Sequence, residues 1–285
     1  MRVMVTGAGG LLGHAVLPVL RAKGDDVHAF THAELDVTDG PGFTARAAEV
    51  RPDWIFHLAA WAKVDDCEAD PGRAHRVNAE GSRHAAESAQ AAGAALLAIS
   101  SDYVFDGSAT RPWREDDPTG PLNVYGASKL AGEQAIRATG VRHWIVRTAW
   151  LFGPGGGNFV DSILKRARSG APLAVVDDQR GSPTYTPDLA EGLRRLAETA
   201  ENGTYHVVSE GTATWHELAV AAVKEAGLAI EVGRTTTAAL ARPARRPAYS
   251  ALATRKFAAA TGWTLPHWSD AVARHVRTSR EGSVA

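Results

Sequence analysis

The sequence has almost no cysteine and no long hydrophobic run. Its one cysteine, Cys67, excludes an internal disulfide. The neighbouring Asp65, Asp66 and Glu68 would raise the pKa of its thiol, so we expect a structural rather than a nucleophilic cysteine. The first apolar run, which ends before Gly7, is too short for a signal peptide, and no later run is long enough to span a membrane. We therefore expect a cytoplasmic protein without membrane contact.

Neither sign of charge dominates the chain. Lys and Arg number 31 and Asp and Glu number 32, so the balance does not indicate nucleic acid or an anionic membrane as a partner. The 11 histidines show no metal-binding pattern such as His-x-x-x-His beside an acid, so we expect no catalytic metal. The 285 residues, of which 45% are hydrophobic, suffice for one large or two modest domains with a sizeable interior.

Short apolar runs alternate with helical patterns in the first half of the chain. This alternation predicts a doubly wound parallel sheet of the Rossmann type, with strands at 3–5, 27–30, 54–60, 94–101 and 143–147 and a long helix at 78–92. After Trp150 the pattern loosens and predicts a smaller, partly discontinuous α+β lobe. Its helices are expected at 158–169, 186–197 and 215–226, the last with Thr214 as N-cap, and its strands at 173–176 and 205–208. We expect a nucleotide-binding domain at 1–150, completed by about 186–212, and a second lobe at 151–185 and 213–285 that covers a cleft.

A glycine-rich turn joins the first strand to the first helix. The standard spacing of a dinucleotide-binding turn fails because Leu12 occupies its last glycine position, but Gly7-x-x-Gly10-x-x-Gly13 fits. Glycines in such a turn let the backbone approach a pyrophosphate, which the N-terminus of the following helix stabilises. The same spacing also fits a strand–helix turn without a ligand. Because strand and helix are both present, we favour a dinucleotide site.

The end of the second strand decides which nicotinamide dinucleotide binds. An acid there would accept hydrogen bonds from a ribose 2′-OH, whereas a basic residue would accommodate a 2′-phosphate. The residues are Phe30-Thr31-His32, with no acid at the tip, although Glu34 is near. We therefore expect NADPH, with NADH as the alternative. Asp36 could cap the next helix or face the adenine.

Tyr125 and Lys129 lie four residues apart in a stretch that predicts a helix to about residue 139. They fall on one helix face, one turn apart. We predict that the lysine charge lowers the pKa of the phenol from its free value of about 10 toward neutral pH, so that the tyrosine can exchange a proton with a carbinol oxygen. Such a pair is also common on ordinary helices, and only its surroundings favour catalysis.

Several further motifs accompany this pair. They are Arg51-Pro52-Asp53, Val64-Asp65 with Glu68, Asn158-Phe159, Asp178-Gln179 and the stretches 100–107, 122–130, 147–150, 181–184 and 243–247. Together with the glycine turn, the serine-ended strand and Tyr125-x-x-x-Lys129, they resemble the extended short-chain dehydrogenase/reductases. Within that family the chain is similar to the dTDP-4-dehydrorhamnose reductase subgroup over nearly its whole length.

The resemblance implies an NAD(P)H-dependent reductase that converts the C4 ketone of a dTDP-4-keto-6-deoxyhexose to the alcohol, in the biosynthesis of dTDP-rhamnose or a related deoxysugar. It makes Tyr125 the general acid, Lys129 the residue that tunes it and holds the nicotinamide ribose, and Ser101 the donor to the substrate carbonyl. The implied cofactor contacts are Gly7, Gly9, Gly10, Leu11 and Gly13 at the pyrophosphate, Thr31 and His32 at the strand tip, Asp36 and Val37 at the adenine, and Ala60, Trp61 and Ala62. The implied substrate contacts are Val64, Ser101, Asp102, Trp150 and one of Arg245 and Arg246, which would pair with the diphosphate.

Three positions depart from the subgroup's pattern. Ser101 stands where a threonine is frequent but keeps the hydroxyl, and Trp61 is bulkier than expected. Some relatives hold a magnesium ion at a dimer interface through an acid after the last glycine of the turn. Here that segment is His14-Ala15, so a homodimer of that kind is in doubt and the oligomeric state stays open.

Other functions stay open on the same scaffold. One is an epimerase or a reductase that acts on a different nucleotide sugar. Another is a non-enzymatic regulatory subunit of the methionine adenosyltransferase type, which a relative of this family provides. The intact set of Ser101, Tyr125 and Lys129 argues against that last function.

Overall fold

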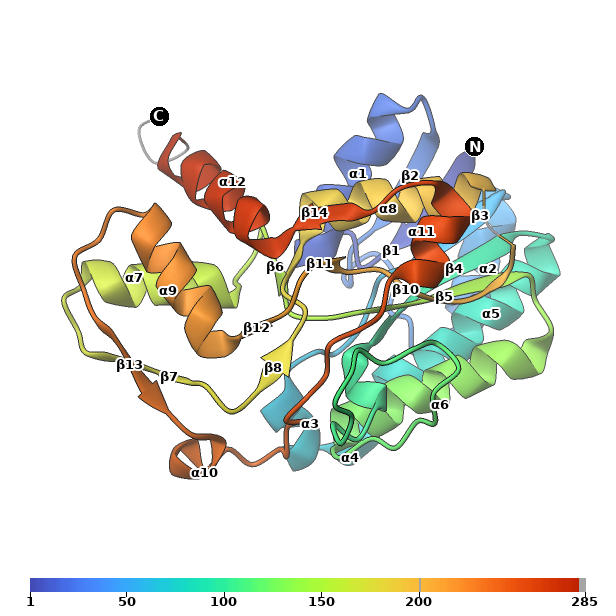
Figure 1. The fold of residues 1–285 in the computed structure, drawn as a ribbon. Coiled ribbons are helices and arrows are strands. Elements are labelled where there is room, and N and C mark those ends of the chain that lie inside the picture. The colour runs from blue at the N-terminus through green and yellow to red at the C-terminus, as the bar shows by residue number, and fades with distance from the viewer. Residues whose placement is uncertain (200, 282–285) are drawn as a thin grey trace.

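The computed structural model describes residues 1–199 and 201–281. Its larger lobe is built on one six-stranded sheet, on the right of Figure 1. Every neighbouring pair in this sheet is parallel, which confirms the predicted Rossmann-type architecture. In order across the sheet the strands are β10 (Gly203–His206), β5 (His143–Thr148), β4 (Ala95–Ser101), β3 (Trp54–His57), β1 (Arg2–Thr6) and β2 (Asp26–Phe30).

Helices cover both faces of the sheet. One face packs against α1 (Leu11–Ala22), α8 (Thr186–Thr199) and α11 (Arg255–Thr261), through a fully apolar core that includes Val16, Leu193 and Phe257. The other face packs against α2 (Gly40–Val50), α5 (Gly81–Ala92) and α6 (Val124–Thr139). The helix expected at 78–92 is α5 preceded by a π-helical turn, η1 (Arg76–Glu80), and by the short helices α3 (Val64–Ala69) and α4 (Pro71–His75).

The smaller lobe lies on the left of Figure 1 and is a mixed α+β unit. Its core lies between α7 (Phe159–Arg168), α9 (Trp215–Glu225) and α12 (Trp268–Glu281). Asn158 caps α7, and Thr214 caps α9 in a reciprocal capping box with Glu217, which confirms the N-cap predicted at Thr214. Beside this core, β7 (Leu173–Val176) pairs in parallel with β13 (Val232–Thr235), which α10 (Thr237–Leu240) follows. Three pairs of short strands complete the structure: β6 (Leu151–Phe152) with β9 (Thr184–Tyr185), β8 (Arg180–Gly181) with β12 (Ala213–Thr214), and β11 (Ser209–Glu210) with β14 (Leu265–His267).

The topology fixes where a ligand can bind. The chain order reverses between β1 and β3, and open α/β sheets bind ligands at such a reversal, beyond the carboxyl ends of the strands. The strand expected at 54–60 ends at His57, because the chain then leaves the sheet and passes over Gly7, whose added Cβ would lie 2.6 Å from the Ala59 nitrogen. β10 returns from the second half of the chain to the sheet edge beside β5, which supports the discontinuous domain division that we propose.

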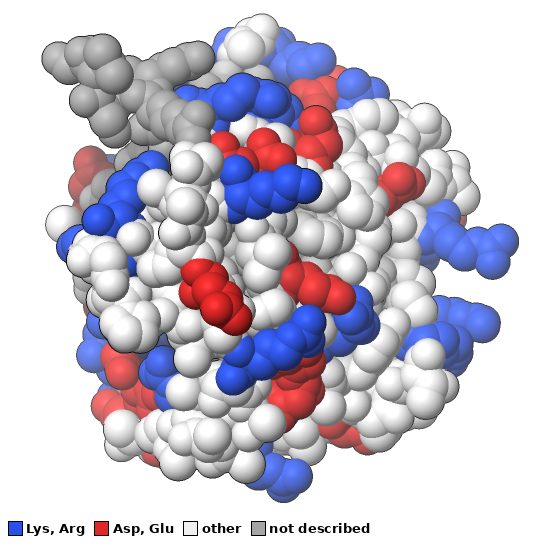
Figure 2. All heavy atoms as spheres, turned by 60° about the vertical axis from the view of Figure 1, so that its left-hand side comes forward, with Lys and Arg blue, Asp and Glu red and all other residues white. Residues whose placement is uncertain are grey.

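Figure 2 shows the distribution of charge on one face of the molecule. On the face drawn in Figure 2, basic and acidic side chains of the described residues are interspersed. Within residues 1–199 and 201–281, no helix has the length and apolarity needed to cross a membrane.

Candidate active site

The glycine turn forms a close-packed cradle at the carboxyl end of β1. Gly7 has φ +72°, and a Cβ on Gly13 would lie 2.5 Å from the Ala8 carbonyl oxygen, so both positions require glycine. α1 begins directly after Gly10, which provides no side-chain cap, and its first turn contains no acid. The first N–H groups of α1 are therefore available to an anion, and the positive end of the helix dipole favours one. This arrangement fits the pyrophosphate of a dinucleotide.

An acid does stand at the tip of β2, although the sequence did not place it there. The Thr31 backbone N–H and Oγ1 both donate to Glu34 Oε2, each at 2.8 Å. Thr31 also lies against the glycine-rich turn, because a Cβ on Gly9 would be 3.5 Å from Thr31 Cγ2. Glu34 thus folds back to the position from which a carboxylate meets the adenosine ribose.

We expect the variant Glu34→Gln to shift cofactor use toward NADPH. The carboxylate accepts hydrogen bonds from a 2′-OH and repels a 2′-phosphate, so neutralising it should raise the ratio of kcat/KM for NADPH to that for NADH about fivefold to tenfold. Steady-state kinetics with both cofactors would measure this ratio. Glu49→Gln, an exposed acid on α2, is the matched control. An unchanged ratio in Glu34→Gln would show that Glu34 does not contact the cofactor.

The two positions expected at the adenine have other roles in the fold. Asp36 does not cap α2, because it accepts from the Thr38 N–H and hydroxyl, each at 2.9 Å, while Asp39 is the N-cap. Val37 is buried, with its carbonyl 2.9 Å from His84 Nδ1. Only the backbone of this segment and the exposed side of Asp36 remain for contact with an adenine.

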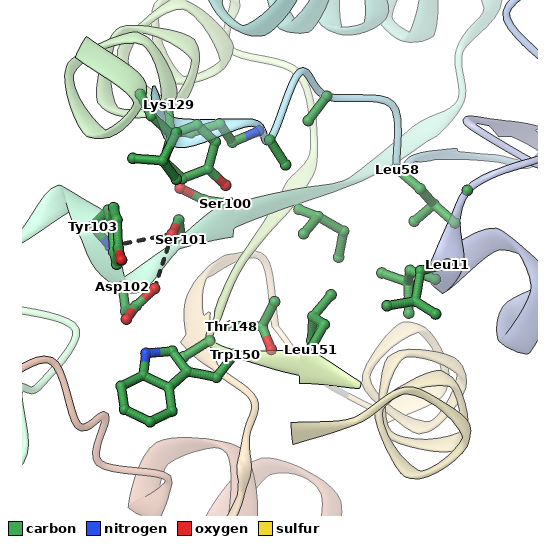
Figure 3. A pocket seen from close by; sticks show the side chains of 18 of the residues that line it. Leu11, Leu58, Ser100, Ser101, Asp102, Tyr103, Lys129, Thr148, Trp150 and Leu151 are labelled. Carbon is green, nitrogen blue, oxygen red and sulfur yellow. Dashed lines mark hydrogen bonds between the residues drawn. The ribbon is translucent and has the colours of Figure 1, made fainter. Parts of the chain in front are cut away.

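The end of β4 and the start of α6 bring the catalytic candidates together. Asn123 caps α6 by accepting from the Gly126 N–H at 2.8 Å. Gly126 packs so closely on the carbonyl of Tyr103 that no side chain would fit there, which draws the first turn of α6 onto the end of β4. As a result the side chains of Ser101 and Tyr125 line the same cleft, and Lys129 is buried one turn further along α6. Figure 3 shows Ser101 between Asp102 and Tyr103, with Lys129 on the same side of the cleft and Trp150 opposite Asp102.

The predicted fall in the pKa of Tyr125 is wrong for this structure. Burial raises the pKa of the phenol above its ordinary value, the nearby Ser101 hydroxyl opposes this, and the charge of Asp102 adds to it. Burial also lowers the pKa of Lys129 to about 8, opposed by the charge of Glu133. Desolvation therefore outweighs the attraction between ammonium and phenolate on which the prediction relied. Tyr125 stays a protonated phenol, which is the form that donates a proton.

The segment after β3 is fixed to α6 by its backbone. Trp61 donates its N–H to Asn78 Oδ1 at 2.8 Å, and Asn78 Nδ2 donates to the Trp61 carbonyl at 3.1 Å and to Ser128 Oγ at 3.0 Å. The Trp61 indole faces the Arg73 guanidinium, 4.5 Å from the ring centre, which explains how this bulky residue is accommodated. Cys67 is buried against the Trp61 carbonyl, and burial raises its pKa to about 11, as expected for a structural thiol.

An aromatic wall forms where the end of β5 meets α9 of the smaller lobe. Trp150, at φ +48°, stacks on Trp215 of α9 with ring centres 3.6 Å apart and planes 6° apart. Arg246 reaches the same cleft and donates to Asp65 Oδ2 at 2.9 Å. Arg245 is exposed and joins the site only through its carbonyl, which accepts from Asn123. Of the two arginines considered for the diphosphate, the structure places only Arg246 in the cleft.

The cleft has a volume of about 570 Å³ and collects most of the predicted site. The predicted residues that line it are Gly7, Gly10, Leu11, Gly13, Ala60, Ala62, Val64, Ser101, Asp102, Tyr125, Lys129, Trp150 and Arg246. Those outside its lining are Gly9, Thr31, His32, Asp36, Val37, Trp61 and Arg245. Lining residues that the sequence analysis did not select include Tyr103, Thr148, Phe159 and Trp215. Thr148 ends β5, a position that could have drawn attention, whereas nothing in the sequence links Trp215 to Trp150. Within the described residues, no three His, Cys, Asp or Glu side chains form a metal-binding group.

The parallel sheet, the glycine cradle and the Ser101, Tyr125 and Lys129 set together define an NAD(P)-dependent oxidoreductase of the extended short-chain dehydrogenase/reductase class. The RmlD substrate binding domain family matches residues 1–281. The chain therefore belongs to this family, whose reductases include a dTDP-4-dehydrorhamnose reductase from Streptomyces griseus that is 45% identical over 95% of this chain and 91% of its own length.

Two further relatives bear on function. The crystal structure of dTDP-4-dehydrorhamnose reductase from Bacillus anthracis in complex with NADP has a TM-score of 0.94 and 35% identity, and covers 97% of this chain and 99% of that one. A probable dTDP-4,6-dihydroxy-2-methyloxan-3-one 4-ketoreductase from Streptomyces antibioticus is 40% identical over 88% of this chain and 86% of its own length. The resemblance inferred from the sequence motifs, the fold class and the nicotinamide cofactor are thereby confirmed.

Proposed function

We propose that the protein reduces the C4 ketone of a dTDP-linked 4-keto-6-deoxyhexose, dTDP-4-dehydrorhamnose, to the alcohol. The observation that carries this proposal is that Ser101 and Tyr125 line the same cleft at the carboxyl end of β4, together with Lys129, the glycine cradle and the aromatic wall. A hydroxyl and a protonated phenol at one point are what a ketone oxygen needs when it gains negative charge. The relatives named above supply the class of sugar nucleotide.

The cofactor side of the site follows from the cradle. Gly7, Gly10 and the first turn of α1 would hold the pyrophosphate, Glu34 and Thr31 the adenosine ribose, and Lys129 the nicotinamide ribose. When bound, the reduced nicotinamide supplies the hydride. Burial keeps the pKa of Lys129 near 8, so a large share of the lysine is charged at neutral pH and can donate hydrogen bonds to ribose hydroxyls.

In the reduction step the protein itself contributes one proton and one hydrogen-bond donor. Tyr125 donates its proton to the developing alkoxide, and Ser101 donates a hydrogen bond to the same oxygen. Because both groups are buried in the wall of the cleft, their dipoles act at low local dielectric and need no reorganisation during the step. Trp150 and Val64 border the sugar ring and exclude water from it.

A second cavity, of about 690 Å³, adjoins the cleft and shares Phe159, Trp215 and Arg246 with it. Its other walls come from α7, β7 and α10. It has apolar surfaces for a base and the Arg246 guanidinium at its junction with the cleft, where a diphosphate would lie. We propose that the nucleotide portion of the substrate binds here, so that the sugar points toward Ser101 and Tyr125.

We expect Gly181→Ala to impair the binding and turnover of the sugar. A Cβ at Gly181 would lie 2.5 Å from Cε2 of Trp150, so the indole must shift from its stack on Trp215. A displacement of this size at a positioning wall should lower kcat/KM about tenfold or more. Gly120→Ala, whose Cβ would meet Asp106 at an ordinary 3.5 Å, serves as the control and should retain wild-type kinetics. Equal kcat/KM for Gly181→Ala and the wild type would remove Trp150 from the substrate site.

The proposed function is tested by following the absorbance of reduced cofactor. Purified protein would be mixed with NADPH or NADH and enzymatically prepared dTDP-4-dehydro-6-deoxyhexose, with and without the epimerase that forms the rhamno-configured ketone. Oxidation of the cofactor only when the epimerase is present is the expected result. Oxidation without the epimerase would instead establish a reductase of a different deoxysugar, which the similarity to the Streptomyces antibioticus ketoreductase makes the second candidate. No oxidation in either mixture would refute both.

A further inference from the structure

Ser101 directs its one hydrogen to a neighbouring carboxylate within the protein. Its Oγ donates to Asp102 Oδ1 at 2.9 Å and accepts from the Tyr103 N–H at 3.2 Å, two bonds drawn in Figure 3. A serine hydroxyl has one hydrogen and two lone pairs. Because the one hydrogen is directed at Asp102, Ser101 cannot donate to a substrate carbonyl in this arrangement.

The neighbour that holds this hydrogen is buried with it. Asp102 is 2% exposed and Ser101 is 6% exposed, and both line the cleft. An ionised carboxylate accepts only, so it competes with the substrate for the serine hydrogen. A protonated carboxyl can instead donate to Ser101 Oγ across the same 2.9 Å. The lone pair that it needs is the one that Ser101 Oγ does not use toward the Tyr103 N–H.

We propose that Asp102 is a positioning residue that acts through Ser101: in its neutral form it donates to Ser101 Oγ and directs the serine hydroxyl at the substrate carbonyl. The resulting series of hydrogen bonds runs from the Asp102 carboxyl to Ser101 and then to the ketone oxygen. No proton leaves Asp102 in this series, and the proton that the alkoxide gains comes from Tyr125. This inference rests on the proposed ketone reduction and adds a residue that controls one of its two donors.

The surroundings of Asp102 favour its neutral form. Burial raises the pKa of Asp102 to about 7, although the nearby hydroxyls of Ser250 and Ser101 oppose this rise. The titratable groups that face it are the phenols of Tyr103, on the same turn, and Tyr125, on α6, and the negative charge of Asp102 raises the pKa of each. Neutral phenols do not stabilise an ionised carboxylate as a cation would. A neutral Asp102 is therefore well populated up to neutral pH and is lost as the pH rises above it.

The first test compares pH profiles of ketone reduction. In the wild type, kcat/KM should fall on the order of tenfold between about pH 6 and about pH 9, because one donor of this kind contributes about a hundredfold or more. Asp102→Asn should lose the part of this fall centred near pH 7, since its amide N–H donates to Ser101 at every pH, and should keep the fall above about pH 8 that loss of the Lys129 charge causes. Asp106→Asn, an exposed aspartate outside the cleft, should keep the wild-type profile. A fall that persists unchanged in Asp102→Asn would overturn the proposal.

Two further measurements separate this proposal from the proposed function and from misfolding. Ser101→Ala should be slow and should lack the fall near pH 7, because Asp102 acts only through the serine, and a retained fall near pH 7 would contradict this route. Carbon-13 NMR of aspartate carboxyls, assigned by comparison with Asp102→Asn, needs no substrate and no turnover. A carboxyl that titrates near pH 7 and moves in Ser101→Ala supports the proposal, whereas an Asp102 already ionised at about pH 5 refutes it.

Discussion

Tyr125→Phe should reduce the rate of ketone reduction by about a thousandfold or more, within the range that general acids contribute. The variant keeps the ring, which packs edge-to-face on Tyr103, and removes only the proton that the alkoxide must receive. Binding of the reduced cofactor should stay unchanged, because the cradle at Gly7 and the start of α1 are untouched. Single-turnover oxidation of NADPH and fluorescence titration of cofactor binding would measure the two quantities.

The matched control is Tyr205→Phe, which removes a phenol that donates to the Glu201 carbonyl at 2.8 Å, outside the cleft lining. It should cost some stability and no catalysis. The raised pKa of Tyr125 adds a second check, because its proton is lost only well above the ordinary range of a tyrosine. A fall in reduction near neutral pH therefore belongs to another group, such as Asp102. A Phe variant that reduces substrate at the wild-type rate would exclude Tyr125 as the acid.

Glu133→Gln is expected to have the largest effect on stability. Glu133 accepts two hydrogen bonds from Arg147, both at 2.8 Å, and one from Ser100 at 2.6 Å. Arg147 is 3% exposed and Glu133 is 1% exposed, so removal of the carboxylate charge leaves a buried guanidinium uncompensated. Such a loss costs about 3–5 kcal/mol, which in a chain of this size lowers Tm by roughly 10 °C. Urea denaturation and thermal melting would measure the two changes.

The exposed pair Arg83–Glu87 on α5 provides the comparison. Glu87→Gln removes a carboxylate in the same kind of helical setting, but both side chains are largely in solvent, so the cost should stay below about 0.5 kcal/mol. Equal effects of the two substitutions would contradict the role assigned to Glu133. Glu133 also raises the pKa of Lys129, so Glu133→Gln should lower that pKa further and weaken ribose binding at neutral pH.

The sequence predicts those parts of the site that depend on local spacing. Three features of the site depend on local geometry alone. They are the glycine turn, the four-residue interval between Tyr125 and Lys129, and the serine at the end of β4. The pKa of Tyr125 could not be predicted in this way. Its direction depends on how deeply the phenol is buried, and that follows from the contact of Gly126 with Tyr103 between two elements.

Other residues were missed because their partners are distant or their side chains turn away. Trp215 lies on Trp150 only because α9 of the smaller lobe meets the end of β5. Glu34 reaches the tip of β2 through a turn that its own hydrogen bonds to Thr31 create. Trp61 lies at the expected place in the chain, but its indole contacts Arg73 rather than the cleft. Spacing gives position along an element, and it does not give side-chain direction in a loop.

The stacked indoles of Trp150 and Trp215 have an optical consequence. Two indoles at 3.6 Å with nearly parallel planes couple their electronic transitions, and such coupling depends steeply on their distance and angle. One ring follows the last residue of β5 in the larger lobe and the other begins α9 in the smaller lobe. The near-ultraviolet circular dichroism of this protein should therefore change when the angle between the two lobes changes, and it can be measured without an added label.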